Sequence, residues 1–166
     1  LELAEDLRKG VADEQIEVWY QPQIDASTLE VLALEALVRW RHPQQGLLSP
    51  VAFLPAARRV GLMGLLSDNI AWQAVRDLHH LREAGLDLRV AINCAPPELL
   101  SQTFLPRLYN ALEEWDVPPD RIQVEVTEDS FLADPQRARD VLLDLRERGI
   151  EVAIDDYGTG FSSLTY

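Results

Sequence analysis

The spacing of hydrophobic and polar residues predicts five strands in this chain. Each predicted strand is a short run rich in β-branched, apolar or aromatic residues, bounded by turn-forming residues. The runs cover residues 16–25, 31–40, 88–94, 122–127 and 150–155. From the third strand onwards, strands alternate with helical segments, which indicates a mostly parallel sheet covered by helices. The predicted fold class is therefore α/β.

Helical spacing and helix-end residues predict the segments between these strands. Leu3, Leu7 and Val11 recur at helical spacing and predict a short first helix that ends near Gly10. Ser49-Pro50 and Asp134-Pro135 are typical helix starts, since proline suits the first helical turn. The further predicted helices cover residues 50–60, 67 or 68–84, 97–115 in one or two pieces, and 135–148.

Length and composition indicate one ordinary domain over residues 1–166, with 47% hydrophobic residues to form its core. No apolar stretch is long enough to span a bilayer, and no charged segment precedes an apolar signal sequence, so a soluble, cytoplasmic protein is expected. Cys94 is the one cysteine in the sequence, which excludes an internal disulfide.

The charge balance restricts the ligands that such a chain can bind. Fifteen Lys and Arg against 28 Asp and Glu give 15 − 28 = −13. This balance argues against binding to duplex DNA or RNA. A small anionic ligand requires metal ions or a few arginines that reverse the local potential.

Side chains with oxygen donors lie on four of the predicted strands or just after them, where parallel α/β sheets carry their sites. They are Glu35, followed by Arg39; Asn93; Glu125 and Glu128; and Asp155 and Asp156. Oxygen ligands without a cluster of histidine or cysteine suit Mg²⁺ or Mn²⁺ better than zinc or copper. The pattern therefore predicts a metal site at one edge of the sheet.

Glu35 has two interpretations. Its neighbours are apolar, and a buried carboxylate needs a compensating partner. Arg39 shares its strand face, so the pair could form an internal salt bridge. Alternatively, Glu35 binds a metal and Arg39 a phosphate.

The histidines, serines and tryptophans of the sequence form no pattern that indicates a metal or catalytic site. The sequence has no zinc-binding spacing, and His79 and His80 are expected to face solvent on a helix. Ser162 and Ser163 have no histidine in a motif that would activate them, so a loop-stabilising role is expected. The tryptophans are expected to pack in the core or between helices: Trp19, Trp40, Trp72 and Trp115.

Six ordered segments resemble the EAL family of cyclic di-GMP phosphodiesterases. They are Tyr20-Gln21-Pro22, residues 35–43 with the literal Glu-Ala-Leu, residues 49–55, Ile92-Asn93, residues 125–128 and residues 155–164. The resemblance implies a modified TIM barrel whose first strand runs antiparallel. It also implies hydrolysis of cyclic di-GMP to linear pGpG with two Mg²⁺ or Mn²⁺ ions, in a homodimer linked to a sensory or GGDEF domain.

The resemblance assigns roles by position. The implied metal ligands are Glu35, Asn93, Glu125, Asp155 and Asp156. Arg39 matches a phosphate-contacting arginine, and Gln21 is expected to line the substrate pocket. Glu128 matches the acid that steadies the loop after the Asp pair, and it is grouped with Glu35 and Asp156 as catalytic.

The sequence also departs from the family pattern. Ala95, Arg58 and Phe161 replace the common serine, glutamate and tyrosine, and Arg58 reverses a charge near the barrel mouth. The family's lysine beyond the Asp-Asp loop has no position before Tyr166. We therefore expect the N-terminal two-thirds of an EAL domain, an incomplete barrel of about five strands. The alternatives are an inactive cyclic di-GMP-binding or protein-interaction module on the same scaffold, and a TIM-barrel metal hydrolase with another substrate.

Overall fold

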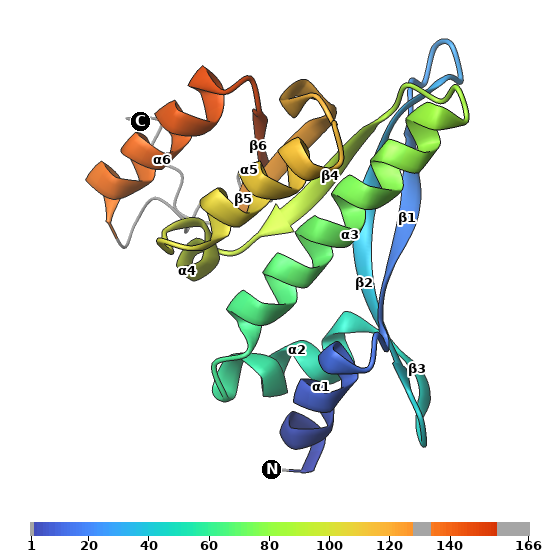
Figure 1. The fold of residues 1–166 in the computed structure, drawn as a ribbon, viewed down its shortest axis with the longest axis vertical. Coiled ribbons are helices and arrows are strands. Elements are labelled where there is room, and N and C mark those ends of the chain that lie inside the picture. Colours follow the sequence, from blue (N-terminus) through green and yellow to red (C-terminus); the bar gives the residue numbers. More distant parts are fainter. Residues whose placement is uncertain (1, 128–133, 156–166) are drawn as a thin grey trace.

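The computed structural model describes residues 2–127 and 134–155, and the structural statements below concern this part of the chain (Figure 1). The strands are β1 (Ile16–Ile24), β2 (Val31–His42), β3 (Gly46–Leu48), β4 (Arg89–Cys94), β5 (Ile122–Thr127) and β6 (Glu151–Asp155). The α-helices are α1 (Glu2–Ala12), α2 (Pro50–Arg59), α3 (Met63–Glu83), α4 (Pro96–Leu99), α5 (Phe104–Glu114) and α6 (Pro135–Glu147).

The strands form one sheet in the order β1-β2-β4-β5-β6, and β3 pairs with β2. β1 runs antiparallel to β2, whereas β2, β4, β5 and β6 are parallel to one another. The antiparallel first strand is therefore confirmed. Among the described strands the sheet remains open, with β1 and β6 at its edges, as expected for an incomplete TIM-like barrel.

The main core lies between one face of the sheet and the helices α3, α5 and α6. Period-two alternation turns Ile92 and Val124 toward these helices, and their side chains are 1% and 0% exposed. On α3 and α5, Leu78 and Leu108 pack into the same cluster. The odd-numbered positions of β4 and β5 consequently belong to the opposite face of the sheet.

A smaller core surrounds Trp40, which is fully buried among residues of α1 and α2. The predicted helix end at Gly10 was wrong, because α1 continues to Ala12. Glycine is needed at this position for packing: a Cβ on Gly10 would lie 2.7 Å from Trp40 Nε1. The indole nitrogen donates a hydrogen bond to Gln15 Oε1 at 3.3 Å.

The start predicted for α3 was also wrong. The helix begins at Met63, directly after the turn at Gly61. Asp68 lies inside the helix and pairs with Arg107 of α5, so it is a packing contact between helices and does not cap one. The start predicted at Asp134-Pro135 is confirmed, since the Asp134 carboxylate accepts a hydrogen bond from the Arg137 N–H at 3.1 Å.

The short strand β3 was not predicted. Its three residues pair with residues 40–42 at the end of β2. His42 stabilises the intervening turn because its Nδ1 accepts hydrogen bonds from the N–H groups of Gln44 and Gln45. In the described ranges, no helix has both the length and the apolar character that crossing a membrane requires.

Candidate active site

Strand register brings Glu35, Asn93 and Glu125 to one face of the sheet. Glu35 pairs with Ala91 of the neighbouring strand, and Asn93 pairs directly with Glu125. Since paired residues in a parallel sheet point to the same side, the three side chains share the face opposite the helices. Asn93 is exposed, and Glu35 and Glu125 are half-buried.

A hydrogen bond joins two of these side chains directly. The amide nitrogen of Asn93 donates to Glu35 Oε1 at 3.1 Å. This arrangement leaves the amide oxygen of Asn93 and the second carboxylate oxygen of Glu35 without a hydrogen bond to any described residue. The hydrogen bond therefore joins two side chains that each keep an oxygen atom able to bind a metal ion.

The salt-bridge interpretation of Glu35 is not supported. Arg39 Nη1 instead donates to the Val38 carbonyl at 2.9 Å. No ion pair connects the described side chains of Arg39 and Glu35. Arg39 lies four residues farther along β2 than Glu35, on the same strand face.

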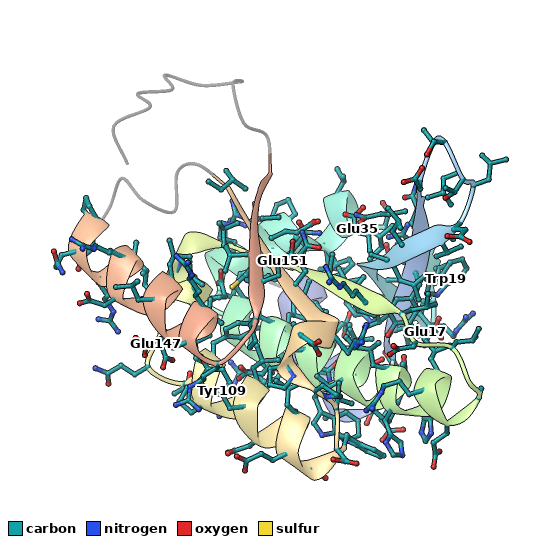
Figure 2. The ribbon with its side chains drawn as sticks, turned by 90° about the horizontal axis from the view of Figure 1, so that it is seen from above. Glu17, Trp19, Glu35, Tyr109, Glu147 and Glu151 are labelled. Atoms are coloured by element: carbon teal, nitrogen blue, oxygen red, sulfur yellow. The ribbon has the colours of Figure 1, made fainter. Side chains whose placement is uncertain are left out.

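Gln21 flanks Glu35 across the antiparallel strand pair. The two residues are register partners in β1 and β2, and Gln21 is exposed. The structure thus brings together four sequence-predicted side chains: Gln21, Glu35, Asn93 and Glu125. Figure 2 shows Glu35 among the side chains along the sheet, whereas Tyr109 and Glu147 belong to the helical layer.

The remaining predicted site residues are Glu128, directly after β5 in sequence, Asp155, the last residue of β6, and Asp156. In the backbone, Asp155 is the register partner of Thr127, two positions beyond the pair formed by Glu125 and Ala153. Glu128 and Asp156 lie outside the described residues, so their assigned roles stay predictions.

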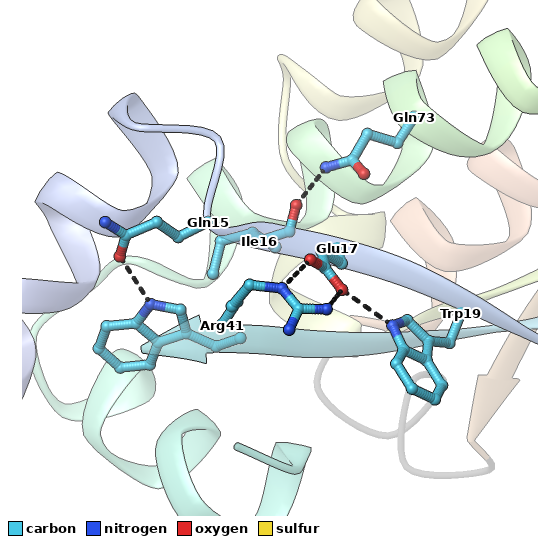
Figure 3. Close-up of polar contacts among 7 residues, drawn as sticks. Gln15, Ile16, Glu17, Trp19, Arg41 and Gln73 are labelled. Atoms are coloured by element: carbon cyan, nitrogen blue, oxygen red, sulfur yellow. Dashed lines mark hydrogen bonds and ion pairs between the residues drawn. The ribbon is translucent and has the colours of Figure 1, made fainter. Parts of the chain in front are cut away.

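A polar network beside Gln21 was missed by the sequence analysis (Figure 3). Arg41 forms a two-point ion pair with Glu17, with Nε–Oε1 2.5 Å and Nη2–Oε2 3.0 Å. Trp19 Nε1 donates to the same carboxylate at 3.0 Å, and the Arg41 hydrogen bond is the main cause that lowers the pKa of Glu17. Trp19 is 46% exposed, which corrects the expectation that it packs in the core. Glu17, Trp19 and Gln21 alternate along β1 and so share one face of the strand, which could have indicated this network from the sequence.

Glu98 is buried close to the end of β4. It lies in α4 with 6% of its surface exposed, and its Oε2 has no hydrogen-bond partner among the described residues. Burial raises the pKa of this carboxyl group, and the positive charge of Arg58 acts in the opposite direction. Arg58 and Glu98 therefore interact electrostatically in this chain.

The donor set fits a hard divalent cation. Glu35 and Glu125 provide carboxylate oxygens and Asn93 an amide oxygen, all on adjacent strands of one face. Such oxygen-rich sets suit Mg²⁺ or Mn²⁺. Bound cations would offset the acidic character of the chain toward an anionic ligand.

Sequence comparisons show to which family the chain belongs. The EAL domain model matches residues 4–166. The chain is 41% identical over its whole length to the cyclic di-GMP phosphodiesterase NbdA of Pseudomonas aeruginosa and covers 21% of that protein. It is 36% identical over 96% of its length to the cyclic di-GMP phosphodiesterase PdeR of Escherichia coli, of which it covers 24%. The chain thus spans about a fifth to a quarter of these relatives.

Solved structures show the same fold. A complex of PaMucR phosphodiesterase with cyclic di-GMP superimposes with a TM-score of 0.92 at 32% identity, covering 98% of this chain and 66% of the other. The EAL enzyme Bd1971 bound to cAMP and cyclic di-GMP gives 0.89 at 29% identity, covering 99% and 46%. The chain therefore belongs to the EAL domain family and has its TIM-like fold.

Proposed function

We propose that this chain carries the metal- and phosphate-binding part of a cyclic di-GMP phosphodiesterase, which hydrolyses cyclic di-GMP to linear pGpG. The observation that carries the proposal is the hydrogen-bonded pair Glu35–Asn93 beside Glu125 on one sheet face. Relatives at 41% and 36% identity are named as phosphodiesterases of this nucleotide.

In this proposal two Mg²⁺ or Mn²⁺ ions are held by Glu35, Asn93, Glu125, Asp155 and Asp156. Bound divalent ions at such a site would lower the pKa of a water molecule and neutralise negative charge on the phosphoryl oxygens. Asn93 orients Glu35 through the hydrogen bond at 3.1 Å, so the carboxylate presents its free oxygen in a fixed direction. Orientation of this kind normally contributes strongly to metal affinity.

The basic and amide groups beside the acids position the substrate. Arg39 is assigned to a phosphate oxygen, because a guanidinium matches phosphate geometry and keeps its charge at any relevant pH. Gln21 is assigned to the wall of the substrate pocket, across the strand pair from Glu35. The ion pair Glu17–Arg41 braces this strand pair from the same face.

The proposal extends to the protein's surroundings. We assign it to the cytoplasm, as a homodimer linked to a sensory or GGDEF domain. MucR of Pseudomonas aeruginosa, 33% identical over the whole chain, is named a bifunctional diguanylate cyclase/cyclic di-GMP phosphodiesterase. Light scattering of the purified protein should give twice the monomer mass, and a monomer mass would remove the dimer from the proposal.

Product analysis tests the reaction. The natural protein that carries this sequence, incubated with cyclic di-GMP and Mg²⁺, should release linear pGpG, resolved by liquid chromatography. Calorimetry under the same conditions without Mg²⁺ measures binding separately. Tight binding without product would favour the alternative of a nucleotide-binding or interaction module. Hydrolysis of a model phosphodiester that cyclic di-GMP does not inhibit would favour another substrate.

A further inference from the structure

The last two turns of α3 bring two imidazoles and one carboxylate together in the helical layer, apart from the sheet face that carries the candidate active site. Glu83 lies three residues after His80 and four after His79, which places it beside both on the helix surface. Glu83 Oε2 is 3.5 Å from His79 Nε2 and 3.6 Å from His80 Nδ1. One potential ligand atom from each of the three residues lies within 4.8 Å of those of the other two.

These distances suit a metal ion better than direct hydrogen bonds. A hydrogen bond between nitrogen and oxygen is typically about 2.9 Å long. By contrast, a tetrahedral ion with bonds of about 2.0–2.2 Å holds neighbouring ligand atoms about 3.4 Å apart. The spacings of 3.5 and 3.6 Å therefore leave room for an ion between the carboxylate and each ring.

The imidazoles are held in place from one side. The indole of Trp115, directly after α5, lies 5.5 Å from the ring of His79 and 5.7 Å from that of His80. Trp72 packs edge-on against Trp115 at 5.7 Å. The expectation that both histidines simply face solvent was incomplete, because the His79 side chain is 28% exposed while that of His80 is 58% exposed. Such packing restricts the rotamers that the two rings can adopt.

The charges around the cluster also favour a cation. The carboxyl end of a helix carries partial negative charge, and the cluster lies in the last turns of α3. Arg82, which lies between His80 and Glu83 in the sequence, donates to the Asp116 carbonyl at 2.7 Å and is directed to the segment after α5. In Figure 1, α3 ends on the side where β4 begins, away from the carboxyl ends of the parallel strands.

We propose that His79, His80 and Glu83 form a metal site for a borderline transition-metal ion such as Zn²⁺, separate from the oxygen-ligand site on the sheet. Two imidazole nitrogens and a carboxylate are ligands that Zn²⁺ prefers over Mg²⁺. A fourth position remains open to water at the exposed side of the cluster. Binding there joins α3 more firmly to Trp115 and stabilises the helical layer.

Calorimetry with ZnCl₂ on the metal-free chain tests the site, with Mg²⁺ present in excess to occupy the oxygen ligands on the sheet. We expect one Zn²⁺ per chain. His80→Asn and Glu83→Gln should each weaken binding by about tenfold or more, the size of effect seen when the ligand sphere of a site is disturbed. Glu147→Gln is the matched control, since Glu147 also ends a helix, α6, and should leave the affinity unchanged.

Glu83→His distinguishes a ligand from a surface ion-pair partner. An imidazole replaces the carboxylate as a metal ligand but cannot pair with protonated histidines, so Zn²⁺ affinity should be kept or increased. Absence of Zn²⁺ binding, or equal affinity in wild type, His80→Asn and Glu83→Gln, would overturn the proposal.

Tryptophan emission locates the ion. Cu²⁺ bound at this site should quench Trp115, whose ring lies within 6 Å of both imidazoles. Quenching should fall strongly in Trp115→Phe. Equal quenching in wild type and Trp115→Phe would place the ion elsewhere and contradict the proposal.

Discussion

The amide of Asn93 donates a hydrogen bond to the carboxylate of Glu35 at 3.1 Å, across neighbouring parallel strands and 58 residues of sequence. This contact converts two separate motif residues into one structural unit. It also explains how a half-buried carboxylate is compensated without Arg39, whose guanidinium bonds to its own strand.

Replacing Asn93 by alanine should weaken Mg²⁺ binding to the chain by about 10- to 100-fold, because one oxygen ligand and the orientation of Glu35 are lost together. Calorimetric titration with MgCl₂ measures the change. Gln123→Ala is the control on the same sheet face of β5, two residues before Glu125, and should bind as wild type does. Unchanged affinity in Asn93→Ala would show that this amide does not serve the metal.

Gly10→Ala should destabilise the chain although alanine is the better helix former. The added Cβ would lie 2.7 Å from Trp40 Nε1 and 3.1 Å from Trp40 Cε2, in a fully buried setting. Overpacking costs about 1–3 kcal/mol, against a helix gain of about 0.5–1 kcal/mol. Urea unfolding measures the difference.

Gly64→Ala is its matched control in α3. No heavy atom lies within 4 Å of the Cβ position at Gly64. This change should therefore raise the free energy of unfolding by about 0.5 kcal/mol, since glycine in a helix costs backbone entropy. Equal effects of the two substitutions would contradict the proposed contact between α1 and Trp40.

Ile92→Ala should lower the free energy of unfolding by about 2–5 kcal/mol, the range for large-to-small changes in a packed core. Ile92 is 1% exposed between the sheet and the helices. The same substitution at Ile154, which is 47% exposed in β6, should cost less than about 1 kcal/mol. Similar losses at both sites would mean that the core does not lie against β4.

Glu98→Gln should stabilise the chain near neutral pH. Burial raises the folded-state pKa of Glu98 above its ordinary value of 4.5, so folding favours the protonated form. The protonated carboxyl group makes its full contribution to the free energy of unfolding below the pKa of the unfolded state. This contribution is lost as the pH rises through the pKa of the folded state. The advantage of glutamine should therefore grow with pH from about 4.5 upward.

Urea unfolding of both proteins at a series of pH values measures this difference, and Glu114→Gln on the exposed side of α5 is the control. Because the two proteins differ only at position 98, the difference reports the effect of the Glu98 carboxyl group. A difference that stays constant or grows toward acid pH would contradict the burial of this carboxyl group.

Sequence periodicity predicted the strands well, and β5 has the predicted bounds, Ile122–Thr127. Sequence patterns gave wrong helix ends at positions where tertiary contacts determine the residue type. Gly10 resembles a helix end but provides space for Trp40, and Asp68 resembles a cap but pairs with Arg107. The strand β3 has only three residues, too few for a recognisable alternation, and it forms because it pairs with β2.

In the candidate site, strand alternation could predict that Glu35, Asn93 and Glu125 lie on the face opposite the apolar side chains, because successive residues of a strand point to opposite faces. It could not predict the bond between Glu35 and Asn93, which depends on register between strands far apart in sequence. The network of Glu17, Trp19 and Arg41 was also not predicted, because its bonds depend on side-chain conformations that strand alternation does not determine.

The central claim is that the unit formed by Glu35 and Asn93 serves hydrolysis of cyclic di-GMP. Its most direct test is the rate of pGpG release by the natural protein carrying this sequence, with saturating Mg²⁺, in wild type, Glu35→Gln and Glu114→Gln. The account predicts that Glu35→Gln lowers kcat by about 100-fold or more while Glu114→Gln retains the wild-type rate. Wild-type turnover in Glu35→Gln would contradict it.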